Sequence, residues 1–165
     1  MIKLYLDMDG VLADFNKAFA RIKGDAEDRI RFRSAVMDYQ IFEDLDFLPD
    51  TQELLNHVSR LKQVEVEILT SMGTFNPQQG EAAKHQKLKW LNDKNIPYRA
   101  NFVRTKTEKA QYATENSILI DDSVGCISPF IRKGGHGILH TNSSETISIL
   151  DSLILQINAM KALRS

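Results

Sequence analysis

The sequence predicts an α/β fold, a Rossmann-like open parallel sheet with helices on both faces. Apolar runs that end in polar residues alternate along the chain with helix-forming patterns. Strands that alternate with helices pair in parallel through right-handed crossovers, so helices come to cover both faces of the sheet. A length of 165 residues with 42% hydrophobic residues suits one continuous core. We therefore expect a single domain over residues 1–165.

Three central strands are expected, and each ends in polar residues. Residues 2–6, Ile-Lys-Leu-Tyr-Leu, alternate with period two and stop at Asp7. Residues 64–69 and 117–120 follow the same plan. Weaker strand patterns occupy residues 98–103 and 137–140.

Helical patterns fill the intervals between these strands. Apolar residues recur at helical spacing from Leu54 to Leu61, within residues 80–94, and from Ser143 to about Leu163. Asn142 or Ser143 is a suitable cap for the last of these, which we expect to be a long closing helix.

Residues 16–47 do not follow the alternation of strands and helices. They are helix-prone, rich in arginine and contain no clear strand. We expect them to form a small helical cap inserted over the site. Arg29, Arg31 and Arg33 alternate within it, and a solvated helix face is favoured over contact with a substrate.

Composition excludes several classes of function. The net charge of -1 creates no long-range field for gathering nucleic acid or anionic membrane, so stable nucleic-acid binding is not expected. The single cysteine, Cys126, permits no internal disulfide and is read as a small apolar filler. The chain reaches Asp7 before any signal-peptide apolar region, and we expect no apolar run of membrane-spanning length. The expected location is cytoplasmic.

Carboxylates gather where two of the predicted strands end. Asp7 and Asp9 follow the first strand, and Asp121 and Asp122 follow the strand of residues 117–120. Ligands of open α/β sheets bind outside the carboxyl ends of the strands. Carboxylates in one crevice repel unless some are protonated or a cation lies among them, and oxygen ligands favour Mg²⁺. The alternative is that each aspartate serves only a turn or a helix cap.

Groups that bind phosphate are present at the same edge. Thr70 and Ser71 follow the strand of residues 64–69 and can donate hydrogen bonds to phosphate oxygens. Lys109 precedes the Asp121 strand and can supply a positive charge, a role for which Lys106 is the alternative. In-line attack on a phosphoryl group needs its charge shared among such donors and a metal.

These residues together resemble the four motifs of the haloacid dehalogenase (HAD) superfamily of phosphatases. Residues 7–12 (Asp-Met-Asp-Gly-Val-Leu) resemble the first motif, residues 69–71 (Leu-Thr-Ser) the second, Lys109 the third and residues 118–122 (Ile-Leu-Ile-Asp-Asp) the fourth. The resemblance implies that Asp7 forms an aspartyl-phosphate, while Asp9 protonates the leaving oxygen and then activates water.

The same resemblance implies a metal site. Mg²⁺ would be bound by Asp7, by the backbone carbonyl of Asp9 and by an aspartate of the fourth motif. Asp122 is favoured as that direct ligand, with Asp121 second.

Within the superfamily, residues 7–15 together with residues 69–71 are most similar to the 5'(3')-deoxyribonucleotidases, which dephosphorylate nucleoside monophosphates. The resemblance implies that Phe15 packs on the nucleobase, with core packing as the alternative. The cap is shorter than is usual in that family and has no tryptophan, which leaves aromatic surface to three phenylalanines: Phe19, Phe32 and Phe42.

The leading hypothesis is a Mg²⁺-dependent phosphomonoester hydrolase acting on nucleoside monophosphates. One alternative is a phosphatase of a nucleic-acid 3' end or of another small molecule, because a small cap leaves the crevice open. The other is a noncatalytic binding module with the same fold. The sequence is also compatible with a homodimer in which a second subunit supplies a lid.

Overall fold

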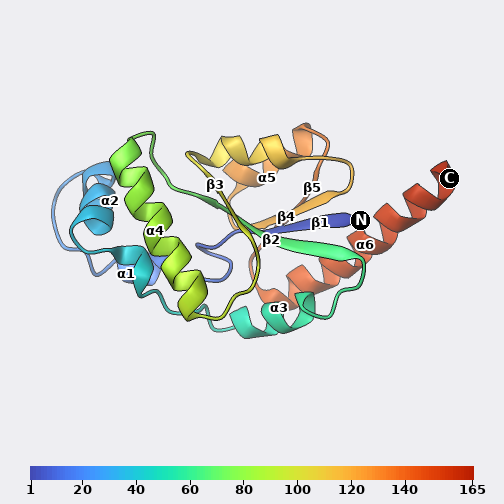
Figure 1. Ribbon diagram of the computed structural model, residues 1–165, viewed down its shortest axis with the longest axis horizontal. Helices are drawn as coiled ribbons and strands as arrows, with labels where there is room; N and C mark the ends of the chain where they lie inside the picture. Colours follow the sequence, from blue (N-terminus) through green and yellow to red (C-terminus); the bar gives the residue numbers. More distant parts are fainter.

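The computed structural model describes all residues 1–165 and contains a five-stranded sheet in which all neighbouring strands are parallel (Figure 1). The strand order is β3-β2-β1-β4-β5. The strands are β1 (Ile2–Leu6), β2 (Val64–Ser71), β3 (Ala100–Val103), β4 (Ser117–Asp121) and β5 (His136–Leu139). The predicted α/β fold and its central strands are confirmed, and the two weaker strands form within about two residues of their expected bounds.

The helices lie in the expected intervals of the chain. They are α1 (Phe15–Phe19), α2 (Asp28–Met37), α3 (Thr51–Val58), α4 (Pro77–Asp93), α5 (Val124–Arg132) and α6 (Ser143–Arg164), with short 3-10 helices η1 (Ile41–Glu43) and η2 (Lys106–Tyr112). The side chain of Asn142 accepts a hydrogen bond from the Glu145 amide at 2.9 Å, so Asn142 is the cap of α6.

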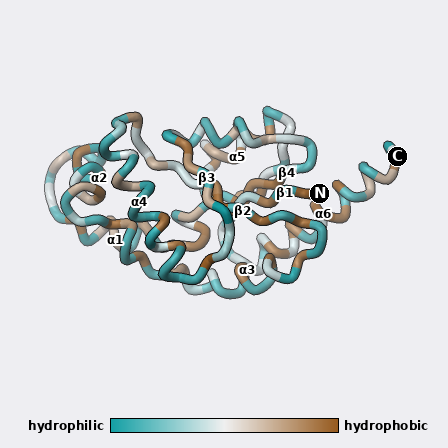
Figure 2. The backbone as a smooth tube through the Cα atoms, in the orientation of Figure 1, coloured by the Kyte–Doolittle hydropathy of each residue, from teal (hydrophilic) through white to brown (hydrophobic).

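Two hydrophobic clusters cover the two faces of the sheet. Leu4 and Leu6 of β1 belong to a cluster of 24 buried residues that also takes in side chains of α3, α4 and α6. Tyr5, which points to the other face, packs with Leu119 and with Phe130 of α5 in a cluster of seven. This division follows the period of two in a strand, and Figure 2 shows hydrophobic residues along β1 at the centre of the molecule.

Strand register places the polar ends of three strands at one edge. Leu6 is level with Ile68 of β2 and with Ile120 of β4. Asp7, which follows Leu6, and Asp121, which follows Ile120 and ends β4, therefore lie side by side, and β2 ends nearby at Ser71. This edge carries the side chains singled out in the sequence.

Residues 16–47 contain α2, η1 and most of α1, and α4 connects this segment to the sheet. The side-chain amide of Gln86 donates to the Val36 carbonyl at 2.8 Å and accepts from the Phe42 amide at 3.4 Å. The indole of Trp90 donates to the Leu45 carbonyl at 2.7 Å. Figure 1 shows α1 and α2 beside α4, at the end of the molecule opposite the C-terminus.

Helix α6 corrects one expectation, that no apolar run reaches membrane-spanning length. It has 22 residues and a window of mean hydropathy 1.2, which meets that criterion by length and composition alone, and 17% of the window is buried. Serine and aspartate residues interrupt the apolar residues of α6, so the sequence does not show one continuous apolar run. The helix packs on the domain through buried Leu150 and Ile157, and Asp151 lies 2.7 Å from the His57 ring of α3.

Candidate active site

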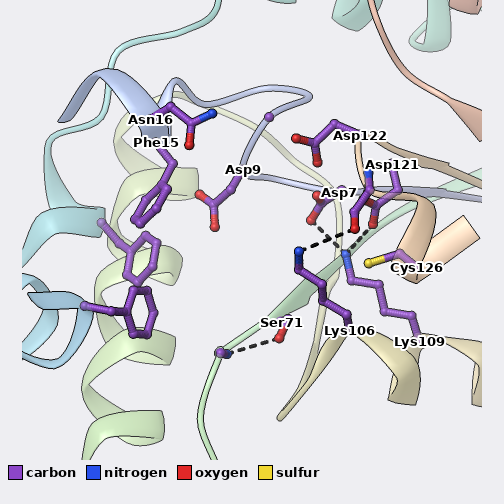
Figure 3. Close-up of a pocket in the computed structure, with 15 residues that line it drawn as sticks. Asp7, Asp9, Phe15, Asn16, Ser71, Lys106, Lys109, Asp121, Asp122 and Cys126 are labelled. Carbon is purple, nitrogen blue, oxygen red and sulfur yellow. Dashed lines mark hydrogen bonds and ion pairs between the residues drawn. The ribbon is translucent and has the colours of Figure 1, made fainter. Parts of the chain in front are cut away.

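Three carboxylates meet at the carboxyl edge of the sheet. Asp7 follows β1, Asp121 ends β4 and Asp122 follows it, and one oxygen from each lies within 4.8 Å of the others. Asp7 and Asp121 are buried, whereas Asp122 is exposed. Figure 3 shows the three side chains converging on one point. The structure thus brings together the acidic residues of the two strand ends.

Lys109 is the lysine that reaches between these carboxylates. It is 1% exposed, and its ammonium donates to Asp7 Oδ1 at 2.8 Å and to Asp121 Oδ2 at 2.7 Å. Lys106 lies one turn earlier in η2 and points its ammonium toward the Ser123 hydroxyl at 3.4 Å. Both lysines line the pocket, but only Lys109 forms ion pairs with the carboxylates.

The electrostatics of the group leave a place for a cation. Burial raises the pKa of Asp7 to about 8, assisted by Asp121 and Asp9 and opposed by Lys109. Burial and then Asp121 raise the pKa of Asp122. One ammonium facing three carboxylates does not neutralise them, so the charged forms need further positive charge. Hard carboxylate oxygens at this spacing fit Mg²⁺.

Gly10 gives Asp122 its position. Its φ of +85° lies in the left-handed region, which side chains other than glycine rarely adopt. A Cβ on this residue would lie 2.1 Å from Asp122 Oδ2. Gly10 therefore lets the loop after β1 pass close to the Asp122 carboxylate, where any other residue would clash with it.

Asp9 stands apart from the three carboxylates and is held by Lys87 of α4. The Lys87 ammonium donates to Asp9 Oδ2 at 3.0 Å, to Thr70 Oγ1 at 2.7 Å and to the Ser71 carbonyl at 2.7 Å. The other oxygen, Asp9 Oδ1, is buried without a hydrogen-bond partner. One oxygen of this carboxylate is thus fixed by Lys87, while the second has no partner within the protein.

Lys87 is absent from the residues that the sequence identified. Its side chain is fully buried, and its ammonium lies 4.5 Å from the centre of the Phe42 ring in η1. The sequence signal that could have identified Lys87 is its helical spacing. It lies four residues after Ala83 and three before Trp90, both of which are buried. A lysine on the buried stripe of a helix needs a partner inside the protein.

The two phosphate-binding candidates of β2 differ in their placement. Ser71 lines the pocket; its hydroxyl donates to the Arg104 carbonyl at 3.2 Å and accepts from the Gly73 amide at 3.1 Å. Thr70 is fully buried, does not line the pocket, and accepts from Lys87. Side chains alternate along a strand, so Ser71 and Thr70 point in opposite directions.

Aromatic rings from the cap form the opposite wall. Phe15 stacks on Phe19 and Phe42, with ring centres 5.3 and 5.6 Å apart, and meets Phe32 edge to face at 6.1 Å. Phe15, Phe32 and Phe42 line the pocket, whereas Phe19 supports Phe15 from behind. Phe15 therefore both packs in the cap and faces the cavity (Figure 3).

The cavity between the two walls has a volume of about 270 Å³. Asn16 and Cys126 also line it, and neither was identified as a site residue from the sequence. Burial raises the pKa of the Cys126 thiol to about 12, so the thiol is protonated near neutral pH and is a poor nucleophile. The pocket thus combines an acidic end with an aromatic end.

Comparison with known proteins rests on solved structures, since no family model and no curated protein matches the sequence. A haloacid dehalogenase-like family hydrolase from Xanthomonas campestris aligns with a TM-score of 0.61 at 13% identity, covering 96% of this chain and 98% of that one. The HAD hydrolase YfnB from Bacillus subtilis, bound to magnesium, has a TM-score of 0.61 at 15% identity, covering 90% and 98%. A hydrolase from Streptococcus pneumoniae has a TM-score of 0.55 at 14% identity, covering 90% and 97%. The chain therefore has the fold of the haloacid dehalogenase-like hydrolases.

Proposed function

We propose that this protein is a Mg²⁺-dependent phosphomonoester hydrolase that acts on nucleoside monophosphates through an aspartyl-phosphate at Asp7. The observation that carries the proposal is the group formed by Asp7, Asp121 and Asp122, with Lys109 buried between two of its members. Such a group supplies a nucleophile and a positive charge beside a metal site, which are the requirements of phosphoryl transfer.

The donor set supports Mg²⁺ as the cofactor. The side chains that would hold the ion are Asp7, Asp122 and Asp121. By the resemblance to the first motif of the superfamily, the backbone carbonyl of Asp9 would be a further ligand. When bound, the ion would offset the negative charge of the phosphate and of the carboxylates. A solved structure of the same fold, YfnB, contains magnesium.

In the proposed reaction, a carboxylate oxygen of Asp7 attacks the phosphorus atom and the bond to the ester oxygen breaks. Asp9 gives its proton to the leaving oxygen, which departs as an alcohol. Asp9 then takes a proton from water as that water attacks the phosphorus of the aspartyl-phosphate. Inorganic phosphate is released and the Asp7 carboxylate is restored. Lys109 has one N–H beyond the two that bind Asp7 and Asp121, and it can donate this to a phosphoryl oxygen. The Ser71 hydroxyl can do the same by turning its proton away from the Arg104 carbonyl.

The aromatic wall supports a nucleotide as the substrate. Rings of Phe15, Phe32 and Phe42 line the same cavity as the carboxylates, so a flat base can stack there while its phosphate reaches Asp7. The cavity volume of about 270 Å³ is close to the lower bound of roughly 300 Å³ for small-molecule sites. The single cysteine agrees with a cytoplasmic enzyme.

The deciding experiment is a Mg²⁺-dependent phosphate-release assay across nucleoside monophosphates, run beside Asp7→Asn. We expect the variant to lose turnover by about 10³-fold or more, because the nucleophile is gone while the shape of the side chain is retained. Circular dichroism should show an unchanged fold.

Asp93→Asn is the matched control, because Asp93 pairs only with Lys89 on the surface of α4. It should retain wild-type turnover. Equal turnover by Asp7→Asn and the wild type would exclude Asp7 as the nucleophile. Absence of phosphate release from every nucleotide and from generic phosphoesters would favour a noncatalytic binding module.

A further inference from the structure

A second and larger cavity adjoins the catalytic pocket. Its volume is about 930 Å³, and it lies between α2 of the cap and the loop that leads from β2 into α4. Phe32 and Gly73 line both cavities. Gly73 has a φ of +73°, and a Cβ there would lie 3.0 Å from the Phe32 ring, so the loop and the cap are in close contact. The two cavities therefore share a boundary formed by Phe32 and Gly73, and a ligand that extends across this boundary would occupy both.

The cap side of this groove carries unpaired positive charge. Arg29 and Arg33 are one helical turn apart on α2, are exposed, and form no ion pair or hydrogen bond with another residue. Their neighbour Arg31 differs, because it donates to the Ile22 carbonyl at 3.0 Å and lies 4.6 Å from the Phe19 ring. Asp38, the acidic residue of the groove, accepts from the Ser34 hydroxyl at 2.8 Å.

The opposite side of the groove offers an aromatic surface. Phe75 is 66% exposed, and the Arg104 guanidinium lies 5.0 Å from the centre of its ring. Arg104 is itself paired with Glu108 at 2.9 Å, so the unpaired arginines that face this ring across the groove are Arg29 and Arg33. An exposed aromatic ring and unpaired arginines in one groove are the combination that binds bases and phosphates of single-stranded nucleic acid. Thr74, Asn76 and Gln79 add polar groups along the same side.

We propose that this groove is a binding site for a second nucleotide, joined through its phosphate to the nucleotide in the catalytic pocket. The linking phosphate pairs with Arg29 and Arg33, and the second base stacks on Phe75. The inference rests on the proposed function for the catalytic pocket. It extends the substrate class to short single-stranded nucleic acids that end in a phosphate. A local pair of arginines can bind such a ligand although the protein as a whole has a net charge of -1.

Calorimetric titrations of Asp7→Asn, which prevents turnover, test the groove by binding alone. The probes are a nucleoside monophosphate, a nucleoside bisphosphate and a dinucleotide with a terminal phosphate. We expect the dinucleotide to bind about tenfold more tightly than the monophosphate, since its second base stacks on an aromatic ring that the monophosphate does not reach. Its affinity should also fall more steeply with salt, because one more phosphate is contacted.

Three variants in the same background assign the contacts. Arg29→Gln with Arg33→Gln, and separately Phe75→Ala, should each remove most of the gain for the dinucleotide and leave binding of the monophosphate unchanged. Arg21→Gln is the matched control, because Arg21 is an exposed arginine of the cap that does not line the groove. It should bind all probes as the background does.

Equal affinity for the dinucleotide and the monophosphate would overturn the proposal. So would a gain for the bisphosphate as large as that for the dinucleotide, since Phe75 would then bind no base. Turnover of monophosphates by the wild type is recorded alongside. Its absence counts against the proposed function, whereas the affinities measured in Asp7→Asn bear on the groove alone.

Discussion

At the scale of single residues, the site depends on two buried lysines that act on different carboxylates. Lys109 pairs with Asp7 and Asp121, and Lys87 pairs with Asp9. A buried ammonium is stabilised only by partners inside the protein, so each lysine also fixes its carboxylate. The proposed acid–base group, Asp9, and the proposed nucleophile, Asp7, are therefore positioned by different lysines.

Lys87→Met should lower kcat by about 10²-fold, the lower range of general acid–base catalysis, because the Asp9 carboxylate loses its orientation. The loss should be smaller for a phosphate ester with a good leaving group, such as 4-nitrophenyl phosphate, which needs little protonation. Steady-state kinetics with both substrates measure this difference.

The matched control is Lys89→Met, two residues away on α4, where the lysine pairs with Asp93 at the surface. This variant should behave as the wild type. An equal loss of kcat for good and poor leaving groups in Lys87→Met would indicate that Lys87 serves the fold and not the proton transfer.

At the scale of elements, α4 is the joint between cap and sheet. The same helix supplies Lys87 to the catalytic edge and Gln86 to the cap, where Gln86 bonds the Val36 carbonyl and the Phe42 amide. Phe42 in turn lines the pocket. The position of the aromatic wall relative to the carboxylates thus depends on contacts made by one helix.

Gln86→Leu should destabilise the cap by about 1–3 kcal/mol, the cost of leaving buried backbone groups without partners. Hydrogen exchange should accelerate in residues 28–43 and remain slow in β1 and β4, and KM for a nucleotide should rise. Gln78→Leu, at an exposed position on the same helix, is the control and should change neither. Equal acceleration of hydrogen exchange across the whole chain would contradict a role of Gln86 confined to the cap.

At the scale of the whole molecule, the site joins loops that are far apart in the chain. Gly10, in the loop after β1, lies against Asp122, in the loop after β4. A cation bound among Asp7, Asp121 and Asp122 would hold these loops together and so stabilise the folded state as a whole.

Mg²⁺ at 100 times its Kd should add about 2.7 kcal/mol to the free energy of unfolding, which raises Tm by roughly 5–10 °C in a chain of this length. Gly10→Ala should lose most of this increase, because the new methyl group displaces Asp122. Thermal scans with Mg²⁺ and with a chelator measure the shift. A full Mg²⁺-dependent increase in Gly10→Ala would show that the contact with Asp122 is dispensable for the metal.

The sequence by itself determined the sheet and the acidic edge of the site. Hydrophobic period and strand-end polarity are local properties, so they identified the core strands and placed Asp7, Asp121 and Asp122 at one edge. The choice between Lys109 and Lys106 came from the structure, in which only Lys109 pairs with these carboxylates. Which of Ser71 and Thr70 faces the pocket depends on how β2 is aligned with its neighbouring strands. That alignment is known only from the structure.

The tertiary structure alone decided two features of the site, the partnership of Lys87 with Asp9 and the second cavity. It also arranged phenylalanines that the sequence had singled out into one wall of the pocket. Lys87 and Asp9 are 78 residues apart, and the groove of Arg29 and Phe75 joins the cap to the loop before α4. Such contacts arise from how helices and loops pack on the sheet. A pattern within one segment can indicate that Lys87 is buried and needs a partner, but it does not identify Asp9 as that partner, because the two residues meet only when α4 packs on the sheet.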